Sequence, residues 1–365
     1  MLAGLVTNSL KTLETSSSIG MFARDTGGCL ISRLGLARSS DEKREISIAE
    51  ISESVLFYFS APALARVNSR LFSRIYDIDK NQLRESVKDL KNVNNNDLQK
   101  IKSAKLGQIL ATFGIILPLV FAIAPIRNNV TLSKDGKDEF VSVVGLKKDK
   151  KDRKEKEAKE KTTGLIKKLA LVSLSSLAAT AGILGFLKNK KNFEKVQGLT
   201  DKFIKKFEFT KDCDLETIHY GALIYPVSIA SYFWASRDKY EFKENARRFS
   251  VTVPLLFFGE KLIQNPIYKY FDKKFKTDVF NGGNILTYKD IEKLPQDKIN
   301  PFLKTKNRAY GATFFINTML IAAAVALLNR IKTKRDYNKD NPSKANSNFK
   351  LLKHNIDDFM LKCKK

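Results

Sequence analysis

The chain of 365 residues is poor in the side chains that build metal and disulfide centres. It has two His, one Trp and three Cys, and the Cys residues lie far apart at positions 29, 213 and 363. Three distant Cys cannot form a disulfide framework and show no metal-ligand spacing. Neither His219 nor His354 has a second His, Cys or carboxylate at a metal-binding spacing. We therefore expect no metal site and no cofactor.

Motifs of nucleotide-binding and hydrolytic enzymes are also missing. The chain has neither a G-x-x-x-x-G-K-[ST] phosphate loop nor a G-x-S-x-G nucleophile elbow. Cys213 lies six residues before His219, but a nucleophilic Cys also needs a third group to orient its base, and the sequence supplies none. We assign no catalytic residue and favour a non-enzymatic protein, and the sequence leaves its reaction or ligand open.

Acidic residues are scarce relative to basic ones, at 39 Asp and Glu against 65 Lys and Arg, for a net charge of +26. Nucleic acid is not the expected partner, because the most charged stretch, Lys147–Lys161, has no aromatic side chain for base stacking. Basic residues near a bilayer are attracted to anionic headgroups by about 1 kcal/mol each. The lipid bilayer, with anionic headgroups, is therefore the expected partner.

Against this charged background, four long stretches carry almost no charge: Leu106–Ile126, Leu169–Leu187, His219–Ala235 and Ala309–Leu328. A helix needs roughly 20 apolar residues to cross a bilayer core about 30 Å thick. Buried helices of a large soluble protein are the alternative interpretation, but a soluble core helix normally keeps a polar stripe. The sequence thus predicts an all-α, multi-pass helical membrane protein with amphipathic basic helices outside the membrane.

Two shorter apolar segments, Ser54–Ala65 and Val251–Ile263, extend the predicted number of membrane segments to between four and six. Each is short for a crossing and contains Pro and an aromatic cluster. The cluster Phe57-Tyr58-Phe59 in one and Leu256-Phe257-Phe258 in the other suggest a loose internal duplication. The resulting division of the chain is an N-terminal helical region 1–103 with a short apolar segment near 54–65, membrane helices 104–126, 165–187, 219–235 and 309–328, a charged linker 127–164, a basic helical loop 188–218, a charged connector 236–249, a short apolar segment 250–263, an amphipathic basic helix and loop 264–308, and a basic tail 329–365 with an amphipathic helix.

The stretch 265–280 predicts a helix with one apolar and one basic face, starting with Asn265 as N-cap and Pro266 in its first turn. Its apolar stripe at i, i+4 spacing consists of Ile267, Phe271, Phe275 and Val279. Its basic residues, the candidate lipid-facing set, are Lys269, Lys273, Lys274 and Lys276. A helix in the membrane interface and a helix packed on the rest of the protein are both consistent with this pattern.

Two further groups of charged residues are candidate functional residues. Glu260 and Lys261 follow an apolar segment, and ionisable groups at membrane depth are often functional; alternatively, both have already reached the interface. The connector group consists of Arg237, Glu244, Arg247 and Arg248. Glu244 is spaced for local ion pairs with the last two. The connector is interpreted either as a coupling or docking helix or as a charged boundary with snorkelling Arg.

The basic loops give a weak orientation signal. If all six segments cross, the loops on the side of residue 45 are slightly richer in Lys and Arg, which favours an N-in, C-in arrangement. Lys11 is the only basic residue among the first 23, so no transit peptide is evident and a bacterial inner membrane is expected.

Two function classes remain. One is a non-enzymatic membrane protein whose basic helices engage anionic lipid or an acidic partner. The other is a small transporter or channel with spans interrupted by Pro118, Pro125, Pro226 and Pro254.

Overall fold

The computed structural model describes residues 2–15, 17–87, 90, 93–147, 154–209, 217–254 and 260–342. This part of the chain is almost entirely helical, so the predicted all-α class is confirmed. The exception is an antiparallel pair of two-residue strands, β1 (Phe280–Asn281) and β2 (Asn284–Ile285). Gly282 and Gly283 join them with φ of 56° and 91°, a conformation that favours glycine.

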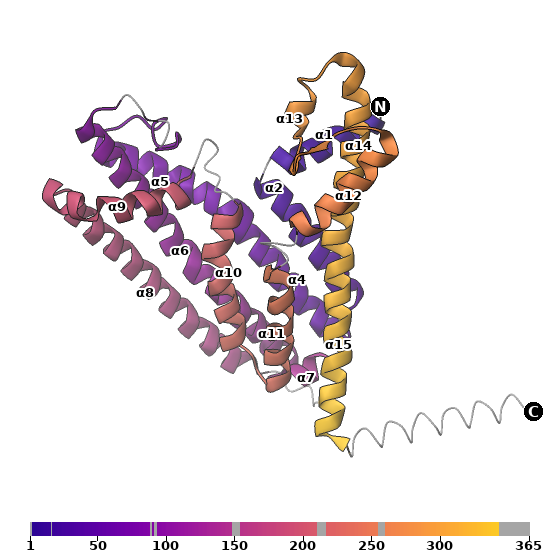
Figure 1. Ribbon diagram of the computed structural model, residues 1–365. Coiled ribbons are helices and arrows are strands. Elements are labelled where there is room, and N and C mark those ends of the chain that lie inside the picture. Colours follow the sequence, from indigo (N-terminus) through magenta and orange to yellow (C-terminus); the bar gives the residue numbers. More distant parts are fainter. Residues whose placement is uncertain are drawn as a thin grey trace, which may run out of the picture.

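The helices are joined mostly by short links (Figure 1). In chain order they are α1 (Leu2–Thr15), α2 (Ser17–Phe22), η1 (Ala23–Leu30), α3 (Ile31–Gly35), α4 (Ser40–Ser54), η2 (Val55–Ser60), α5 (Ala61–Tyr76), α6 (Asn95–Asp135), α7 (Phe140–Val143), α8 (Glu155–Leu187), α9 (Lys190–Phe207), α10 (Thr217–Trp234), α11 (Lys239–Pro254), α12 (Glu260–Phe275), α13 (Tyr288–Ile291), α14 (Gln296–Phe315), η4 (Ile316–Leu320) and α15 (Ile321–Asp340).

Three of the described helices are long and apolar enough to cross a membrane: α6, α8 and the continuous run α14–η4–α15. They contain the predicted spans 104–126, 165–187 and 309–328. The predicted span 219–235 overlaps α10, which has 18 residues and is shorter than these three helices. The apolar window of α6 is 61% buried, whereas those of α8 and of the α14–α15 run are only 11% buried. The outer helices therefore present their apolar side chains to the surroundings.

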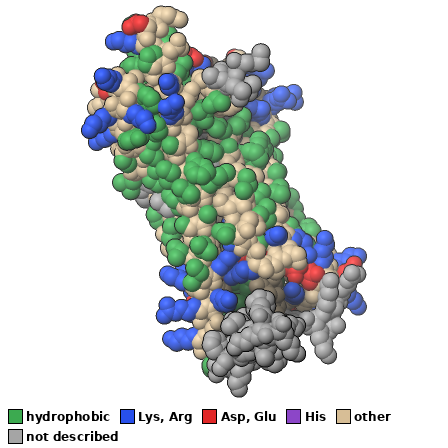
Figure 2. Space-filling model, turned by 90° about the vertical axis from the view of Figure 1, so that its right-hand side faces the viewer, with side chains coloured by type: hydrophobic (Ala, Val, Ile, Leu, Met, Phe, Trp, Pro, Cys, Tyr) green, Lys and Arg blue, Asp and Glu red, His purple; other side chains and the backbone are tan. Residues whose placement is uncertain are grey.

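The exposed apolar side chains form a broad band around the middle of the molecule (Figure 2). Leu171 and Leu174 on α8 are 66% and 64% exposed, and Leu328 on α15 is 56% exposed. Lys and Arg side chains gather above and below this band. A water-soluble bundle turns its apolar faces inward, and large exposed apolar surfaces mark sites of contact with lipid or protein.

The two short apolar segments, which the sequence allows as tilted spans, re-entrant segments or surface helices, do not form separate helices in the described chain. Ser54–Ala65 lies within a single helical run, α4–η2–α5, that extends over residues 40–76. In the second segment α11 ends at Pro254 and α12 begins at Glu260, with residues 255–259 outside the described chain. The predicted helix start at Asn265 is wrong, because α12 begins five residues earlier and contains Pro266 in its interior.

The fold contains two matched halves, which we define as residues 17–135 and 217–340. Several of their helix ends are separated by the same 199 positions: α3 and α10 end at 35 and 234, and α4 and α11 begin at 40 and 239. Helices α5 and α12 occupy 61–76 and 260–275 at the same offset. The aromatic clusters at 57–59 and 256–258 share this offset, although the second lies outside the described residues.

The ends of α5 and α12 repeat in atomic detail. Among the described residues, Asp77 and Lys276 are the non-glycine residues with left-handed φ, at 51° and 52°. The next amide in each half closes the helix on a carbonyl five residues back. Ile78 N donates to Ser73 O at 3.0 Å, and Thr277 N donates to Asp272 O at 3.1 Å. Equal offsets in helix ends, backbone conformation and hydrogen bonds indicate a structural duplication.

Corresponding helices of the two halves run in the same direction, and each half packs its first helix against the other half. In each half the second helix packs on the third, as α4 and α5 pack on α6 and as α11 and α12 pack on α15 and α14. The first helix packs on the third helix of the other half, because α10 contacts α6 while η1 and α3 contact η4 and α15. Gly28 permits the closest of these contacts, since an added Cβ would lie 2.3 Å from Thr318 Cβ.

The two halves meet at one end of the molecule and diverge at the other (Figure 1). We call the end with α7 the convergent end and the end with α9 and α13 the splayed end. α8 and α9 link the halves, and α8 packs against α6. The first helix starts at the splayed end, whereas α15 finishes at the convergent end. At the splayed end Thr287 caps α13, and its hydroxyl hydrogen bond to Asp290 lowers the pKa of that carboxyl.

Candidate functional site

The site begins with the same local motif at the start of α4 and α11. In each, an Arg precedes the N-cap residue and a Glu follows it three positions later: Arg38-Ser39 with Glu42, and Arg237-Asp238 with Glu241. The N-cap side chain accepts the amide of that Glu, at 3.0 Å for Ser39 and 2.9 Å for Asp238. Such caps satisfy amides that the first helical turn leaves without partners.

The Arg of each motif folds back on the Glu four residues later. Arg38 donates its backbone N, Nε and Nη2 to the Glu42 carboxylate at 2.5, 3.1 and 2.8 Å. Arg237 donates the same three groups to Glu241 at 2.9, 3.0 and 3.0 Å. Because every donor is matched by its counterpart 199 positions later, the duplication includes side-chain geometry.

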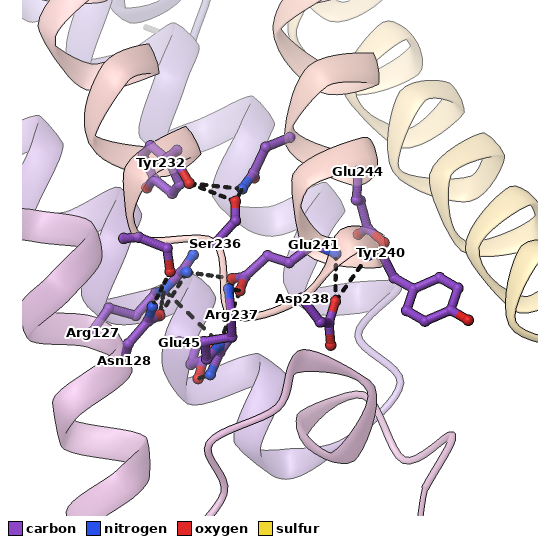
Figure 3. Close-up of polar contacts among 12 residues, drawn as sticks. Glu45, Arg127, Asn128, Tyr232, Ser236, Arg237, Asp238, Tyr240, Glu241 and Glu244 are labelled. Atoms are coloured by element: carbon purple, nitrogen blue, oxygen red, sulfur yellow. Dashed lines mark hydrogen bonds and ion pairs between the residues drawn. The ribbon is translucent and has the colours of Figure 1, made fainter.

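Each Arg also reaches across to the other half, as Figure 3 shows for Arg237. Arg237 Nη1 and Nη2 donate to both oxygens of Glu45 at 2.8 and 2.9 Å. Arg38 Nη2 donates to Glu244 at 3.1 Å. Glu45 and Glu244 are again 199 positions apart, so α4 and α11 hold each other through reciprocal Arg–Glu pairs. This arrangement is what a two-fold axis between the halves would produce.

A further Arg joins from the last helix of each half. Arg127 on α6 lies 2.5 Å from Glu241 and 3.7 Å from Glu45. Arg330 on α15 interacts with the charges of Glu42 and Glu244 and donates to the Arg33 carbonyl at 3.1 Å. We call these four Arg and four Glu side chains the reciprocal Arg–Glu cluster: Arg38, Glu42, Glu45, Arg127, Arg237, Glu241, Glu244 and Arg330.

Burial makes this cluster energetically sensitive. The side chains of Arg127, Arg237, Glu45 and Glu241 are all at most 8% exposed. Charges removed from water are tolerated only when they are paired and hydrogen-bonded. The cluster satisfies this condition by giving each of these carboxylates two guanidinium partners.

A cavity of about 220 Å³ lies beside the cluster, between the halves. Its walls come from α4, α6, α10, α11, η4 and α15, with Cys29 of η1 and Arg33 of α3. Charged groups from the cluster line one part of it. Glu50, Glu53 and Arg248 line it from α4 and α11, and Ile321, Ala322 and Val325 form an apolar wall on α15.

Most charges of the cavity are paired with each other, but Glu53, Arg248 and Arg330 form no ion pair within the described chain. Arg33 pairs with Glu50. Glu53 accepts a hydrogen bond from Ser228 at 3.4 Å and is ion-paired with no Lys or Arg of the described chain. The Arg248 guanidinium lies over the rings of Tyr232 and Phe249, at 4.5 and 4.4 Å from their centroids. No carboxylate of the described residues pairs with it.

Three π-helical turns occur in the described chain, and two of them contribute residues to the cavity walls. These turns are η1, η2 and η4; Cys29 belongs to the first, and Asn317 and Thr318 belong to the third. Thr26 and Ser54 bring η1 and the start of η2 together, with their hydroxyl oxygens 2.6 Å apart. Such turns often occur at functional sites and allow a helix to bend.

The residues predicted to form a charged connector have partners in the structure that differ from the expected local ones. Arg237 and Glu244 belong to the reciprocal Arg–Glu cluster, and Arg248 faces the cavity. The expected local ion pairs of Glu244 are wrong, because Glu244 pairs with Arg38 and accepts from Thr333 at 2.8 Å. Arg247 pairs instead with Asp336 on α15 at 2.5 Å. Side chains on α11 therefore point to other helices rather than along their own.

The other two candidate groups lie at the splayed end. Glu260 and Lys261 begin α12, but their side chains lie outside the described residues. Lys269, Lys273, Lys274 and Lys276 are all exposed. The apolar stripe of α12 packs in a cluster with Ala309 and Tyr310 of α14. The apolar face of α12 is thus packed on the protein, which was one of the two interpretations of the sequence. Its basic face is exposed.

Sequence reasoning missed the first half of the site, namely Arg38, Glu42, Glu45, Glu53 and Arg127. A signal was present, because the pattern R-x-x-x-E-x-x-E occurs at both Arg38 and Arg237. The offset of 199 positions between the two aromatic clusters leads directly from one copy of the pattern to the other. The pattern indicates a site only when the two copies are known to face each other.

Comparison with known proteins adds no assignment. No protein-family model, no curated protein and no solved structure matches this chain. Within the described residues, no three His, Cys, Asp or Glu side chains are grouped so that they could hold a metal ion. The site is thus defined by its own geometry, a charged cavity between two matched halves.

Proposed function

We propose that this chain is a multi-pass membrane transporter for a small polar solute, with its binding site between the two halves. The supporting observation is the reciprocal Arg–Glu pairing of α4 and α11 at an offset of 199 positions, beside a cavity at the same interface. Many transporters consist of two repeats related by an axis along the membrane normal, with the substrate site where the repeats meet. This function was the second of the two classes that the sequence left open.

The bilayer is the medium that best explains the distribution of side chains. The apolar windows of α8 and of the α14–α15 run face outward, whereas the Arg–Glu cluster is buried between the halves, the reverse of a water-soluble bundle. We propose seven crossings: α1–α3, α4–α5, α6, α8, α10, α11–α12 and α14–α15. The expected count of four to six omits the first run, which adds one crossing and moves the N-terminus to the side opposite the end of α15. A bacterial inner membrane remains the proposed location.

The mechanism follows from the position of the ion pairs. The reciprocal Arg–Glu cluster lies near the convergent end and joins α4 of one half to α11 of the other. Rocking of the halves about their shared axis would separate Arg38 from Glu244 and Arg237 from Glu45 together. Each Arg keeps the Glu of its own helix, while Glu45 retains Arg127 at 3.7 Å and Glu244 retains the Thr333 hydroxyl at 2.8 Å. This retention lowers the energetic barrier to opening.

Reconstitution into proteoliposomes tests the function. Purified protein should take up at least one radiolabelled solute from a panel of amino acids, sugars and small carboxylates faster than protein-free liposomes. The double variant Glu45→Gln/Glu244→Gln removes both acceptors between the halves and should change the uptake rate by about tenfold or more. Glu157→Gln/Glu160→Gln, on the exposed start of α8, is the matched control. Well-incorporated protein without flux of any solute would refute transport.

Binding of anionic lipid is a second proposed role, favoured by one observation. Lys269, Lys273, Lys274 and Lys276 are exposed on a helix whose other face is packed. At about 1 kcal/mol per basic residue, replacing all four by Gln should weaken binding of fluorescent phosphatidylglycerol by roughly a thousandfold. Phosphatidylcholine binding should not change, and a Lys156→Gln/Lys159→Gln variant on α8 is the control. Equal phosphatidylglycerol binding by wild type and the fourfold variant would refute this role.

A further inference from the structure

We propose that the cavity binds a small zwitterion of the α-amino-acid type, with its ammonium group at Glu53 and its carboxylate at Arg248. This inference rests on the proposed transport function and names the class of solute. It starts from two of the three charged groups of the cavity wall that form no ion pair among the described residues; the third, Arg330, donates to the Arg33 carbonyl at 3.1 Å. Of the two, one is a carboxylate on α4, and the other is a guanidinium on α11.

Glu53 is available to a cation. Its neighbour Arg33 is already paired with Glu50, and its own hydrogen bond comes from the uncharged Ser228. The position has no acidic counterpart in the second half, where Thr252 stands 199 positions later. The carboxylate is therefore an addition to the duplicated framework and lies outside the reciprocal Arg–Glu cluster.

Arg248 is available to an anion. Tyr232 and Phe249 hold its guanidinium through their ring faces, and its N–H groups form no ion pair with a carboxylate of the described chain, although the charge of Glu53 acts on it. A planar guanidinium fixed in this way offers paired N–H donors that match the two oxygens of a carboxylate. Its counterpart in the first half is Ala49, so this charge, too, is specific to one half.

The rest of the cavity fits an amino acid with an apolar side chain. Ile321, Ala322 and Val325 form an apolar wall, and a volume of about 220 Å³ admits a small solute. The charges of the cavity and cluster are balanced. Six carboxylates, those of Glu42, Glu45, Glu50, Glu53, Glu241 and Glu244, face six guanidinium groups, those of Arg33, Arg38, Arg127, Arg237, Arg248 and Arg330. A zwitterion preserves this balance, whereas an ion of either sign would disturb it.

The test measures binding to the purified full-length chain in detergent by calorimetry, with L-alanine, L-valine and L-leucine as probes. Two analogues of L-leucine each lack one charge: 3-methylbutylamine has no carboxylate, and 4-methylpentanoate has no ammonium group. At least one amino acid should bind, and both analogues should bind about tenfold or more weakly than L-leucine. Equal binding of 4-methylpentanoate and L-leucine would reveal a simple anion site and overturn the proposal, as would absence of binding by all three amino acids.

Two variants test whether Glu53 binds the ammonium group and Arg248 binds the carboxylate of the amino acid. Glu53→Gln and Arg248→Gln should each weaken amino-acid binding by about tenfold or more, while the exposed controls Glu160→Gln and Arg74→Gln should bind like wild type. Gel filtration checks that each variant is folded, and the analogue series on wild type decides the question if one is not. Amino-acid binding without flux would refute transport and keep the site. Flux of other solutes without amino-acid binding would keep transport and refute the site.

Discussion

Replacing Arg237 by Met is expected to lower the free energy of unfolding by about 3–5 kcal/mol, the usual effect of removing one member of a buried charge network. Arg237 donates to both Glu45 and Glu241, and these three side chains are at most 8% exposed. Without it the two carboxylates share Arg127 alone, so one buried negative charge loses its compensation. Met retains most of the side-chain volume, which limits the additional effect of a cavity.

The duplication supplies a matched control for this variant. Arg38 has the corresponding contacts, but it is 15% exposed and its partner Glu244 is 18% exposed. Water can therefore solvate the groups that Arg38→Met leaves behind, and we expect a smaller loss of stability. Denaturant unfolding in detergent, followed by tryptophan fluorescence or circular dichroism, measures both. If Arg237→Met unfolds at the same denaturant concentration as wild type, Arg237 does not stabilise the fold through the cluster, and the prediction is wrong.

Cysteine labelling should divide the loops into two groups on opposite faces of the membrane. In a chain whose Cys29, Cys213 and Cys363 are replaced by Ser, Lys134→Cys and Lys239→Cys at the convergent end should react with an impermeant maleimide from the same side. Lys80→Cys and Lys289→Cys at the splayed end should react only from the opposite side. The expected contrast is all or none, because the reagent cannot cross the lipid core.

The position of the N-terminus separates seven crossings from six. Val6 lies in α1 and is 48% exposed, and α1 lies at the splayed end. Val6→Cys should therefore react from the same side as Lys80→Cys. Labelling from the side of Lys134→Cys would instead support the N-in, C-in arrangement that six crossings imply. Release of the whole chain by carbonate washing would refute membrane insertion altogether.

The apolar helices were predictable because their signal is local. A run such as Leu106–Ile126 has no charged residue, and every side chain in it favours the same environment. The predicted helices therefore lie within α6, α8, α10 and the α14–α15 run. Helix starts were less predictable. Pro266 favours a first turn, yet α12 contains it in its interior, because its apolar face packs in the same cluster as Tyr310 of α14.

Charged residues were harder to interpret, because their partners are distant in sequence. At i, i+4 spacing a local ion pair of Glu244 with Arg248 is worth a few tenths of a kcal/mol. The actual partner of Glu244 is Arg38, 206 positions earlier. A buried ion pair between helices outweighs an exposed local one, because leaving either charge unpaired in the interior is far more costly.

By itself the sequence determined that the chain is helical and that its apolar runs are long enough to span a bilayer, because both depend on the composition and spacing of neighbouring residues. It also carried the two copies of R-x-x-x-E-x-x-E. Only the tertiary structure decided that these copies face each other, that four Glu and four Arg compensate one another between the helices, and that Glu53 and Arg248 are left over beside a cavity. Electrostatic pairing depends on distance in space, and that distance is fixed only when the two halves have packed together.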